Sequence, residues 1–251
     1  MGQYNRKVII SKIGCMYIKN LIYVQSLILF YIYIYIITMD IEKEFVLDVY
    51  DNIAEHFSDT RYCIWDFVKN FLDKQVSSQK GIEIGCGNGK HLCTRDDLDI
   101  IGIDSCEKFV DICTKKNIRV FQQNCCNLIF KDNLFDYALS IAVFHHLSTD
   151  MRRYKALKEM IRILKPGGKG IVSVWACNQD NRNNNMKKRL FVPGDNYVPW
   201  MRKKDKKIFK RYYYIFTEKM FRTFIDQFTE KIIVHTIYNE RCNWIVEFTK
   251  K

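Results

Sequence analysis

The sequence lacks paired cysteine motifs, although it contains ten cysteines. No two of them form a CxxC pair, and no tight cluster of histidines and cysteines has the spacing of metal ligands. These absences argue against a zinc site and against the disulfide framework of a small secreted domain. We therefore expect reduced, mostly buried thiols in an intracellular protein whose chain binds no metal.

An internal repeat is also absent, and the composition does not match a disordered chain. Hydrophobic residues make up 48% and charged residues 27% of the 251 positions, which are globular values. This length suits one sizeable α/β domain but is short for two. The net charge of +12 favours an anionic partner such as nucleic acid or a membrane surface.

Acidic residues are missing from the first 38 positions, and segment 20–38 carries no charge of either sign. This segment nearly reaches the ~20 residues that a bilayer span requires. Its tyrosines argue against a span because Tyr prefers the membrane interface, and it has no small-residue cleavage site for a signal peptidase. Two interpretations remain, a membrane anchor or a non-native or disordered extension ahead of a true start at Met39. We favour the second.

Hydrophobic spacing after Met39 predicts helices first and then alternating strands and helices. Residues 39–76 are expected to form two short amphipathic helices that cover a site. Residues 77–251 contain nearly continuous apolar strands between helices, which predicts a parallel sheet covered on both faces. Within this part we expect a long buried strand over 135–146, a basic loop over 178–211 and a closing β-hairpin.

The strongest local motif is a glycine loop, EIGCGNGK at 83–90, directly after a predicted strand. Alternate glycines let a ligand approach the backbone closely, although glycines alone also occur in an ordinary tight turn. The spacing is GxGxG, which disfavours the dinucleotide motif GxGxxG, and a Walker-type phosphate loop is absent. Asp104 ends the next strand, where a carboxylate can bind both ribose hydroxyls of an adenosine ligand. Asn124 ends a third strand, where its amide could contact an adenine edge.

This combination resembles the class I S-adenosylmethionine-dependent methyltransferases over residues 77–251. The resemblance implies a Rossmann-like, seven-stranded, mostly parallel sheet with helices on both faces and a C-terminal antiparallel hairpin. It also implies S-adenosylmethionine as the cofactor, with the glycine loop near the methionine part and Asp104 near the ribose. The implied cofactor-binding residues are Glu83, Gly85, Cys86, Gly87, Asn88, Gly89, Asp104, Ser105, Asn124, Cys125 and Ile141.

More specific motifs resemble the eukaryotic tRNA wobble-uridine carboxymethyl methyltransferases. They include YDNIAEHFSDTRYCIWDFV, SIAVFHHLSTDMRRYKALKEMIRILKPGGKGIVSVWACNQ, RYYYIF and NERCNWIVEF, and the resemblance runs from Met39 to Lys251. Asn124 departs from it, since an aspartate is usual there, and so does the split segment FVPGDNYVPW. The resemblance implies esterification of 5-carboxymethyluridine in tRNA, a small zinc-binding activator subunit as partner in a heterodimer, and a cytoplasmic location with a nuclear pool as an alternative.

Methylation of a carboxylate needs no strong base because the nucleophile is already anionic at neutral pH. It needs in-line positioning and a cationic group on the acid, which a guanidinium supplies in bidentate geometry. Arg61 and either Arg152 or Arg153 are the candidates. His145 and His146, expected at the end of the fourth strand, offer a hydrogen bond to the uracil or the carboxylate. For Arg153 a solvated helix face, and for the histidines structural roles, are the alternatives.

A basic stretch between Lys187 and Arg211 contains ten Lys or Arg residues with interleaved aromatic residues. Such a charge run is often only a solvated surface, but the aromatic residues favour contact with tRNA through phosphates and stacked bases. Trp65 is a further stacking candidate, with core packing as the alternative. The predicted RNA-binding residues are Lys187, Lys188, Arg189, Trp200, Arg202, Lys203, Lys204, Lys206 and Lys207.

Two other functions compete with a tRNA-modifying enzyme. One is a methyltransferase acting on a small molecule, a lipid quinone or a protein, which the basic aromatic stretch disfavours. The other is a non-catalytic subunit with a methyltransferase fold. The intact glycine loop and Asp104 argue against it.

Overall fold

A computed structural model describes residues 23–24, 27, 29, 41–61, 63–177 and 191–251. The chain divides into two compact units, Met1–Asp40 and Ile41–Lys251. In the first, only Tyr23, Val24, Leu27 and Leu29 are described, all helical and exposed, so the two interpretations of segment 20–38 lie mostly outside the described residues. Across the described ranges, no helix combines the length and apolar character needed to cross a membrane.

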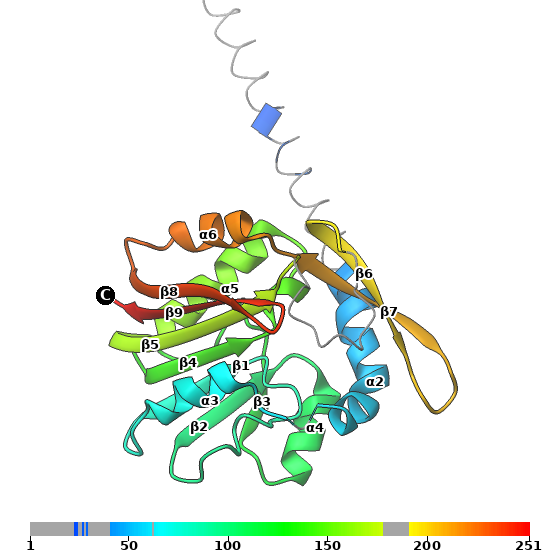
Figure 1. Cartoon of the computed structure of the whole chain (residues 1–251), viewed down its shortest axis with the longest axis horizontal. Coiled ribbons are helices and arrows are strands. Elements are labelled where there is room, and N and C mark those ends of the chain that lie inside the picture. Colours follow the sequence, from blue (N-terminus) through cyan, green and yellow to red (C-terminus); the bar gives the residue numbers. More distant parts are fainter. Residues whose placement is uncertain (1–22, 25–26, 28, 30–40, 62, 178–190) are drawn as a thin grey trace, which may run out of the picture. The chain divides into compact units, whose positions relative to one another are not determined.

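A seven-stranded sheet forms the centre of the second unit, with strand order β3-β2-β1-β4-β5-β9-β8 (Figure 1). Strands β1 to β5 pair in parallel, while β9 runs antiparallel to both of its neighbours. The predicted seven-stranded sheet with a C-terminal hairpin is therefore confirmed. The strands are β1 (Lys80–Ile84), β2 (Asp99–Asp104), β3 (Val120–Gln122), β4 (Phe135–Ile141), β5 (Leu164–Trp175), β8 (Ile232–Glu240) and β9 (Asn243–Lys250).

Helices cover both faces of the sheet because the central strands are apolar on both sides. In β4, Ala138 packs into the cluster formed with α5 (Asp150–Ile163) and α6 (Glu218–Asp226), while Tyr137 and Leu139 pack against α3 (Asp66–Asp73). The side chain of Thr149 caps α5 by accepting a hydrogen bond from the Arg152 amide. This arrangement fixes the carboxyl ends of β1, β2 and β4 at one edge of the sheet.

The two helices predicted before the sheet are present, but they have different neighbours. A π-helix η1 (Lys43–Leu47) leads into α2 (Asp48–Asp59), whose Tyr50 and Ile53 pack with Phe109 of α4 (Glu107–Lys115). The second predicted helix, α3, packs on the sheet itself. The linker between α2 and α3 therefore crosses from one cluster to the other at the edge where β1 and β2 end.

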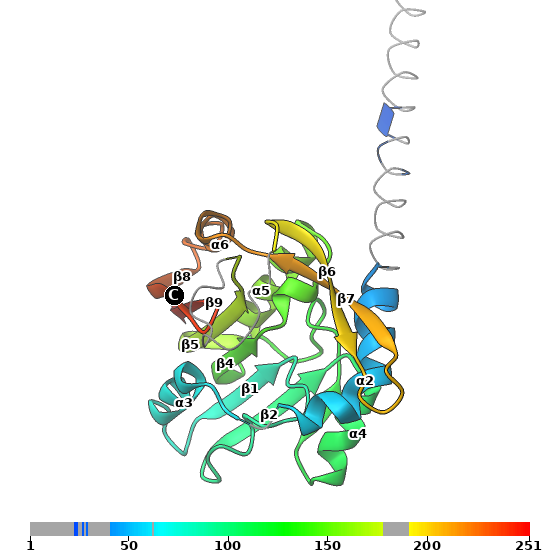
Figure 2. The ribbon, with the colours of Figure 1, turned by 45° about the vertical axis from the view of Figure 1, so that its right-hand side comes forward.

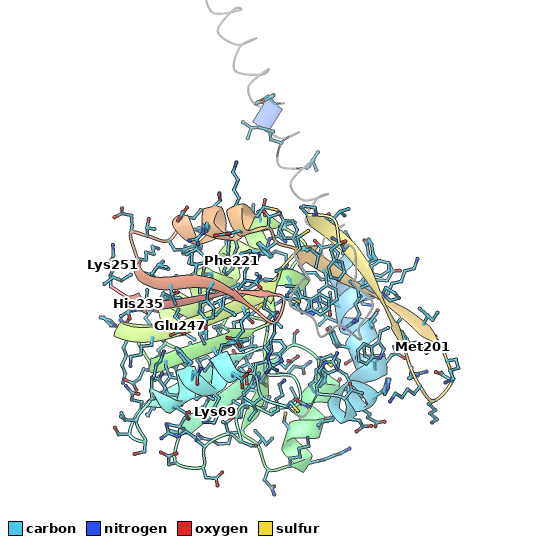
Figure 3. All side chains as sticks on the ribbon, viewed as in Figure 1. Lys69, Met201, Phe221, His235, Glu247 and Lys251 are labelled. Carbon is cyan, nitrogen blue, oxygen red and sulfur yellow. The ribbon has the colours of Figure 1, made fainter. Side chains whose placement is uncertain are left out.

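The prediction of a loop over 178–211 is wrong for its second part. Residues 178–190 lie outside the described residues, but β6 (Gly194–Met201) and β7 (Ile208–Ile215) form a separate antiparallel ribbon beside α2 (Figure 2). Burial along β7 alternates at first, with Phe209 buried between two exposed neighbours, and then becomes continuous from Arg211 to Tyr213. Figure 3 shows Met201 on the part of the ribbon that extends beyond the main sheet.

The N-terminal helices are attached to the site edge by a partly buried ion pair. Glu42 accepts hydrogen bonds from the Ser148 amide at 2.7 Å and from Arg152 Nε at 2.7 Å. The Glu42 and Arg152 side chains are only 10% and 12% exposed. Loss of one partner therefore leaves a charge without compensation in a poorly solvated place.

We expect Glu42→Ala to lower the free energy of unfolding by about 3 kcal/mol, because Arg152 loses its carboxylate. Lys43→Ala removes an ion pair with Asp48 whose side chains are 71% and 51% exposed, and should change stability by less than about 0.5 kcal/mol. Urea unfolding followed by circular dichroism measures both. Equal effects of the two substitutions would contradict the role given to Glu42.

Candidate active site

The glycine loop lies between β1 and the turn that follows it, and its three glycines have different roles. All three have positive φ angles: 74° at Gly85, 54° at Gly87 and 74° at Gly89. A Cβ added at Gly85 would lie 2.4 Å from Val143, and one at Gly89 would lie 2.9 Å from Ile118. A Cβ at Gly87 would meet nothing within 4 Å. Gly87 is therefore the position where the loop backbone faces open space.

Asp104, the last residue of β2, is joined directly to this loop. Its Oδ2 accepts a hydrogen bond from the Gly87 amide at 2.8 Å, and its Oδ1 accepts one from the Cys106 amide at 2.9 Å. Burial raises the pKa of Asp104 to about 6, although these two hydrogen bonds oppose the shift. A half-buried carboxylate beside open loop backbone fits the two ribose hydroxyls of an adenosine ligand. The site chemistry thus fits the predicted cofactor.

Two of the predicted cofactor residues point away from the open side of the loop. Glu83 is 1% exposed, and its Oε1 lies 2.6 Å from His91 Nδ1, while its Oε2 has no hydrogen-bond partner among the described residues. The buried Cys86 thiol packs behind the loop, since a Cβ at Gly102 would lie 2.7 Å from its sulfur. Cys86 therefore presents only its backbone to a ligand.

The other predicted cofactor residues lie at the same edge of the sheet. Asn124 follows β3 and is exposed, but its Oδ1 already accepts a hydrogen bond from the Cys126 amide at 2.9 Å. Asn124 thus shapes the turn in which the half-buried Cys125 lies. Exposed Ser105 follows β2, and buried Ile141 ends β4.

Asn88 attaches the α2–α3 linker to the glycine loop. Its side-chain amide donates to the Arg61 carbonyl at 3.1 Å, and Lys90 Nζ donates to the Cys63 carbonyl at 2.9 Å. Lys90 also lies over the ring of Trp65 at 5.1 Å, so Trp65 is half-buried beside α3 and does not form a free stacking platform. The linker therefore covers the loop on the side of the expected cofactor.

Arg61 places a guanidinium next to this linker. Its Cζ lies 5.4 Å from the centroid of the Phe57 ring and 5.5 Å from that of Trp200. Its Nη1 donates to the Thr60 carbonyl at 3.0 Å, and no carboxylate pairs with it within the described part of the chain. Arg61 is exposed overall, but partial desolvation of its guanidinium and the nearby charge of Arg211 both lower its pKa. Its charge is therefore available to an anion.

Neither of the other two candidate arginines has a free guanidinium. Arg153 is 2% exposed, donates to the Asp150 carboxylate at 2.6 Å and lies 3.6 Å from the ring centroid of Tyr214. Arg152 pairs with Glu42 at 2.7 Å. The geometry thus gives Arg152 and Arg153 structural contacts, and the solvated helix face considered for Arg153 is excluded by its burial.

The sequence predicted the two histidines at the end of the fourth strand, but they do not lie there. Strand β4 stops at Ile141 because Ala142 has a φ of 60°, and His145 and His146 lie in the 3-10 turn η2 (Phe144–His146). His145 is 1% exposed, and its Nδ1 accepts a hydrogen bond from the Trp175 amide at 3.1 Å. Burial, reinforced by the neighbouring His146 and Arg211, lowers the pKa of His145 well below its ordinary value.

His146 bridges two tyrosines. Its Nδ1 lies 2.9 Å from the Tyr212 carbonyl, which can only accept, so this nitrogen carries the hydrogen. Its Nε2 therefore accepts from the Tyr50 hydroxyl at 2.9 Å. Burial lowers the pKa of His146 to about 3, with the Tyr212 carbonyl opposing the shift and Arg211 adding to it. Both histidines are neutral at neutral pH, which suits orientation and not charge stabilisation.

Arg211 in β7 is a site residue that the sequence interpretation missed. It is 2% exposed, its Nη1 donates to the Tyr213 hydroxyl at 2.7 Å, and its Cζ lies 4.8 Å from the Trp200 ring centroid. The sequence signal that could have revealed it is strand-like alternation, since Phe209, Arg211 and Tyr213 occupy every second position. The interpretation of 178–211 as a loop concealed this pattern.

The predicted RNA-binding residues fall into three groups. Lys187, Lys188 and Arg189 lie outside the described residues. Trp200 is half-buried and donates to His56 Nδ1 at 3.2 Å, while Arg202 pairs with Asp205 at 2.5 Å. The remaining four residues are all exposed at the turn of the ribbon: Lys203, Lys204, Lys206 and Lys207.

Within the described ranges, no three His, Cys, Asp or Glu side chains are grouped so as to hold a metal ion.

Comparison with known proteins agrees with this geometry. A family model described as a methyltransferase domain matches residues 82–172. A Schizosaccharomyces pombe tRNA (carboxymethyluridine(34)-5-O)-methyltransferase is 34% identical over 226 residues, covering 83% of this chain and 97% of that protein. The chain belongs to the tRNA carboxymethyluridine methyltransferase family. Its cofactor is S-adenosylmethionine.

Other members of the tRNA carboxymethyluridine methyltransferase family are longer. The Xenopus tropicalis protein alkbh8 is 30% identical over 260 residues, which cover 84% of this chain but 41% of the frog protein. The Arabidopsis thaliana member is 42% identical over 144 residues, which cover 57% of this chain and 36% of that protein. The chain thus spans less than half the length of these two relatives.

Solved structures share the fold at lower identity. A putative S-adenosylmethionine-dependent methyltransferase from Listeria monocytogenes has a TM-score of 0.56 and 14% identity, covering 74% of this chain and 97% of that one. A putative methyltransferase from Haloferax volcanii, solved in complex with the Trm112 methyltransferase activator, has a TM-score of 0.57 and 15% identity, covering 82% and 98%. These likenesses confirm the class I methyltransferase fold.

We expect cofactor affinity to fall as the pH falls through about 6, because a protonated Asp104 no longer accepts from both ribose hydroxyls. Between pH 7.5 and 5.5 the Kd for S-adenosylmethionine should rise about 4-fold, measured by isothermal titration calorimetry. Asp104→Asn should weaken binding at both values and remove this dependence. Asp99→Asn, at the other end of β2, is the control and should retain it.

In the protein without cofactor, the raised pKa of Asp104 has the opposite pH dependence: it favours the folded state at low pH. Since burial raises the pKa of Asp104 from 3.8 to about 6, the folded state binds this proton more tightly than the unfolded state. Its contribution to stability is therefore present at low pH and is lost as the pH rises from about 4 to about 6.

For the binding prediction, a wild-type Kd for S-adenosylmethionine that is independent of pH would contradict the assignment of Asp104 to the ribose.

Proposed function

We propose that the chain transfers the methyl group of S-adenosylmethionine to the carboxylate of 5-carboxymethyluridine at the wobble position of tRNA, forming a methyl ester. The observation that carries this proposal is the position of Arg61. Its backbone is hydrogen-bonded to Asn88 of the glycine loop, and its guanidinium has no acidic partner among the described residues. The names of the relatives support the choice of substrate.

The residues suit a nucleophile that is already ionised. Asp104 and the Gly87 backbone would hold the cofactor, which when bound supplies an electrophilic methyl group on a sulfonium. A carboxylate has a pKa near 4, so no side chain has to remove a proton before the carboxylate oxygen forms its new bond. Arg61 would hold the carboxylate in line, and the neutral His146 would orient Tyr50. No proton is gained or lost in the transfer.

We expect Arg61→Gln to lower kcat/KM for methyl transfer to tRNA by about 100-fold, since the reacting carboxylate loses the cationic partner that the linker supplies. The assay follows labelled methyl groups from the cofactor into tRNA that carries 5-carboxymethyluridine. The Kd for S-adenosylmethionine should stay within about 2-fold, because Arg61 contributes only its carbonyl to the glycine loop.

Arg222→Gln is the matched control, since Arg222 lies on α6 in an exposed ion pair with Glu218. It should retain wild-type transfer. Absence of transfer to any tRNA by the wild-type chain, with an activator subunit present, would reject the proposed function in favour of a non-catalytic subunit. Transfer to small carboxylic acids but not to tRNA would favour the small-molecule alternative.

The ribbon turn is the proposed contact to the tRNA backbone. Lys203, Lys204, Lys206 and Lys207 are exposed there together, and Arg202 is held by Asp205. Lysines at the turn of an extended ribbon can reach phosphates without entering the site. Residues 187–189 belong to the same proposal.

We expect replacement of these four lysines by Gln to weaken tRNA binding and to make its salt dependence shallower. The slope of log K against log salt should become less negative by about 0.7 to 0.9 for each phosphate that the variant no longer neutralises. Fluorescence anisotropy with labelled tRNA at several salt concentrations measures it. An unchanged slope would mean that the lysines form only a solvated surface.

We also propose that the chain binds a small zinc-binding activator subunit. The surface over residues 106–123 supports this, because β3 is an edge strand of the sheet and Phe121 on it is 49% exposed. The Haloferax volcanii neighbour is a methyltransferase in complex with an activator. The transfer assay is therefore run with and without such a subunit.

A further inference from the structure

Two arginines from distant parts of the sequence lie on the same tryptophan. The Cζ atoms of Arg61 and Arg211 lie 5.5 Å and 4.8 Å from the ring centroid of Trp200. Arg61 comes from the α2–α3 linker, whereas Arg211 comes from the ribbon. Among the described residues, no carboxylate forms an ion pair with either guanidinium.

Burial disfavours the charge of Arg211, although the phenols of Tyr213 and Tyr50 oppose this effect and raise its pKa overall. A buried cation is normally paired, because its removal from water is costly. Arg211 is 2% exposed, and the group to which it donates, the phenol of Tyr213, carries no opposite charge. The charge of Arg211 also contributes to the lowered pKa of Arg61. An anion bound by both guanidiniums would offset the burial of Arg211 and the repulsion that lowers the pKa of Arg61.

A chain of hydrogen bonds holds Arg211 in a single orientation. Its Nη1 can only donate, so it donates to the Tyr213 hydroxyl at 2.7 Å. The Tyr213 hydroxyl then lies 3.4 Å from that of Tyr50, which donates to His146 Nε2 at 2.9 Å. His146 in turn donates to the Tyr212 carbonyl. The donor-only Arg211 at one end and the acceptor-only Tyr212 carbonyl at the other fix the donor-to-acceptor direction of this series of hydrogen bonds.

This chain leaves another donor of Arg211 unused. Its Nε is buried and has no partner within the described part of the molecule. A guanidinium presents its Nε and one Nη as a planar fork that matches the two oxygens of a carboxylate. A buried, unpartnered donor on an arginine that packs on the same tryptophan as a second arginine is an arrangement suited to binding an anion.

We propose that Arg211 and Arg61 together form a clamp that selects an anionic carboxylate and rejects the neutral amide of the same base. This inference rests on the proposed function and assigns its specificity to a residue in the ribbon. A neutral amide would leave a desolvated cation without compensation, which is the strongest basis for rejection. The methyl ester formed by the reaction is also neutral, so the clamp favours release of the product.

The test compares two tRNAs that differ only in the wobble base, one carrying 5-carboxymethyluridine and the other 5-carbamoylmethyluridine. Binding is measured by anisotropy in the presence of S-adenosylhomocysteine, so that no transfer occurs. We expect the wild-type chain to bind the carboxylate form at least about 10-fold more tightly. Arg211→Gln should reduce this preference to within about 2-fold, through weaker binding of the carboxylate form, and should not weaken binding of the amide form.

Tyr213→Phe is a second variant that keeps the ring and removes the acceptor for Arg211. It should reduce the preference by about 3-fold, which a purely structural role would not do. Arg211→Lys should retain only part of the preference, because an ammonium lacks the fork. Arg222→Gln is the control and should keep the preference in full.

The outcomes separate this inference from the proposed function. A preference that survives in Arg211→Gln would overturn the clamp, even if wild-type transfer to tRNA is normal. Where Arg211→Gln fails to fold, as judged by its melting temperature and cofactor binding, an undiminished preference in both Tyr213→Phe and Arg211→Lys would overturn it. Failure of wild-type transfer to any tRNA rejects the proposed function instead.

Discussion

The hydrogen bond from the Asn88 side chain to the Arg61 carbonyl is the contact on which the site depends. The glycine loop belongs to the sheet, while Arg61 belongs to a linker between two helices that pack in different clusters. A linker of this kind has no regular structure to fix a side chain. Because Asn88 and Lys90 bind its carbonyls, the linker takes one path over the loop, and the Arg61 guanidinium is placed beside the cofactor site.

A second constraint is the balance of charge around Trp200 and Tyr213. Two guanidiniums and two neutral histidines surround aromatic and phenolic side chains, and no acidic group pairs with the two arginines in the described residues. Burial keeps the histidines neutral, so they accept and donate fixed hydrogen bonds and add no charge. The site is therefore cationic, and its neutral histidines are not needed as bases. This combination suits a substrate that brings its own negative charge.

Much of the fold could be predicted because it follows from local patterns. Apolar strands alternating with helices indicated the parallel sheet, and the glycine spacing with Asp104 located the cofactor edge. The strand over 135–146 was predicted too long, since apolar residues continue into η2 while the backbone at Ala142 turns to a positive φ. The ribbon was not predicted because the lysines at its turn make this segment strongly basic, and a run of charged residues is typical of a loop.

The arginines show most clearly which roles could not be assigned from the sequence alone. Arg61, Arg152, Arg153 and Arg211 have the same chemistry, and nothing local separates a buried structural guanidinium from one that faces a ligand. The sequence determined the sheet, the cofactor loop and the excess of positive charge, because these depend on periodicity and composition. The tertiary structure alone decided that Arg152 pairs with Glu42 and that Arg153 is buried, because both depend on how whole elements pack, whereas the Asp150–Arg153 pair follows from i,i+3 spacing on one helix.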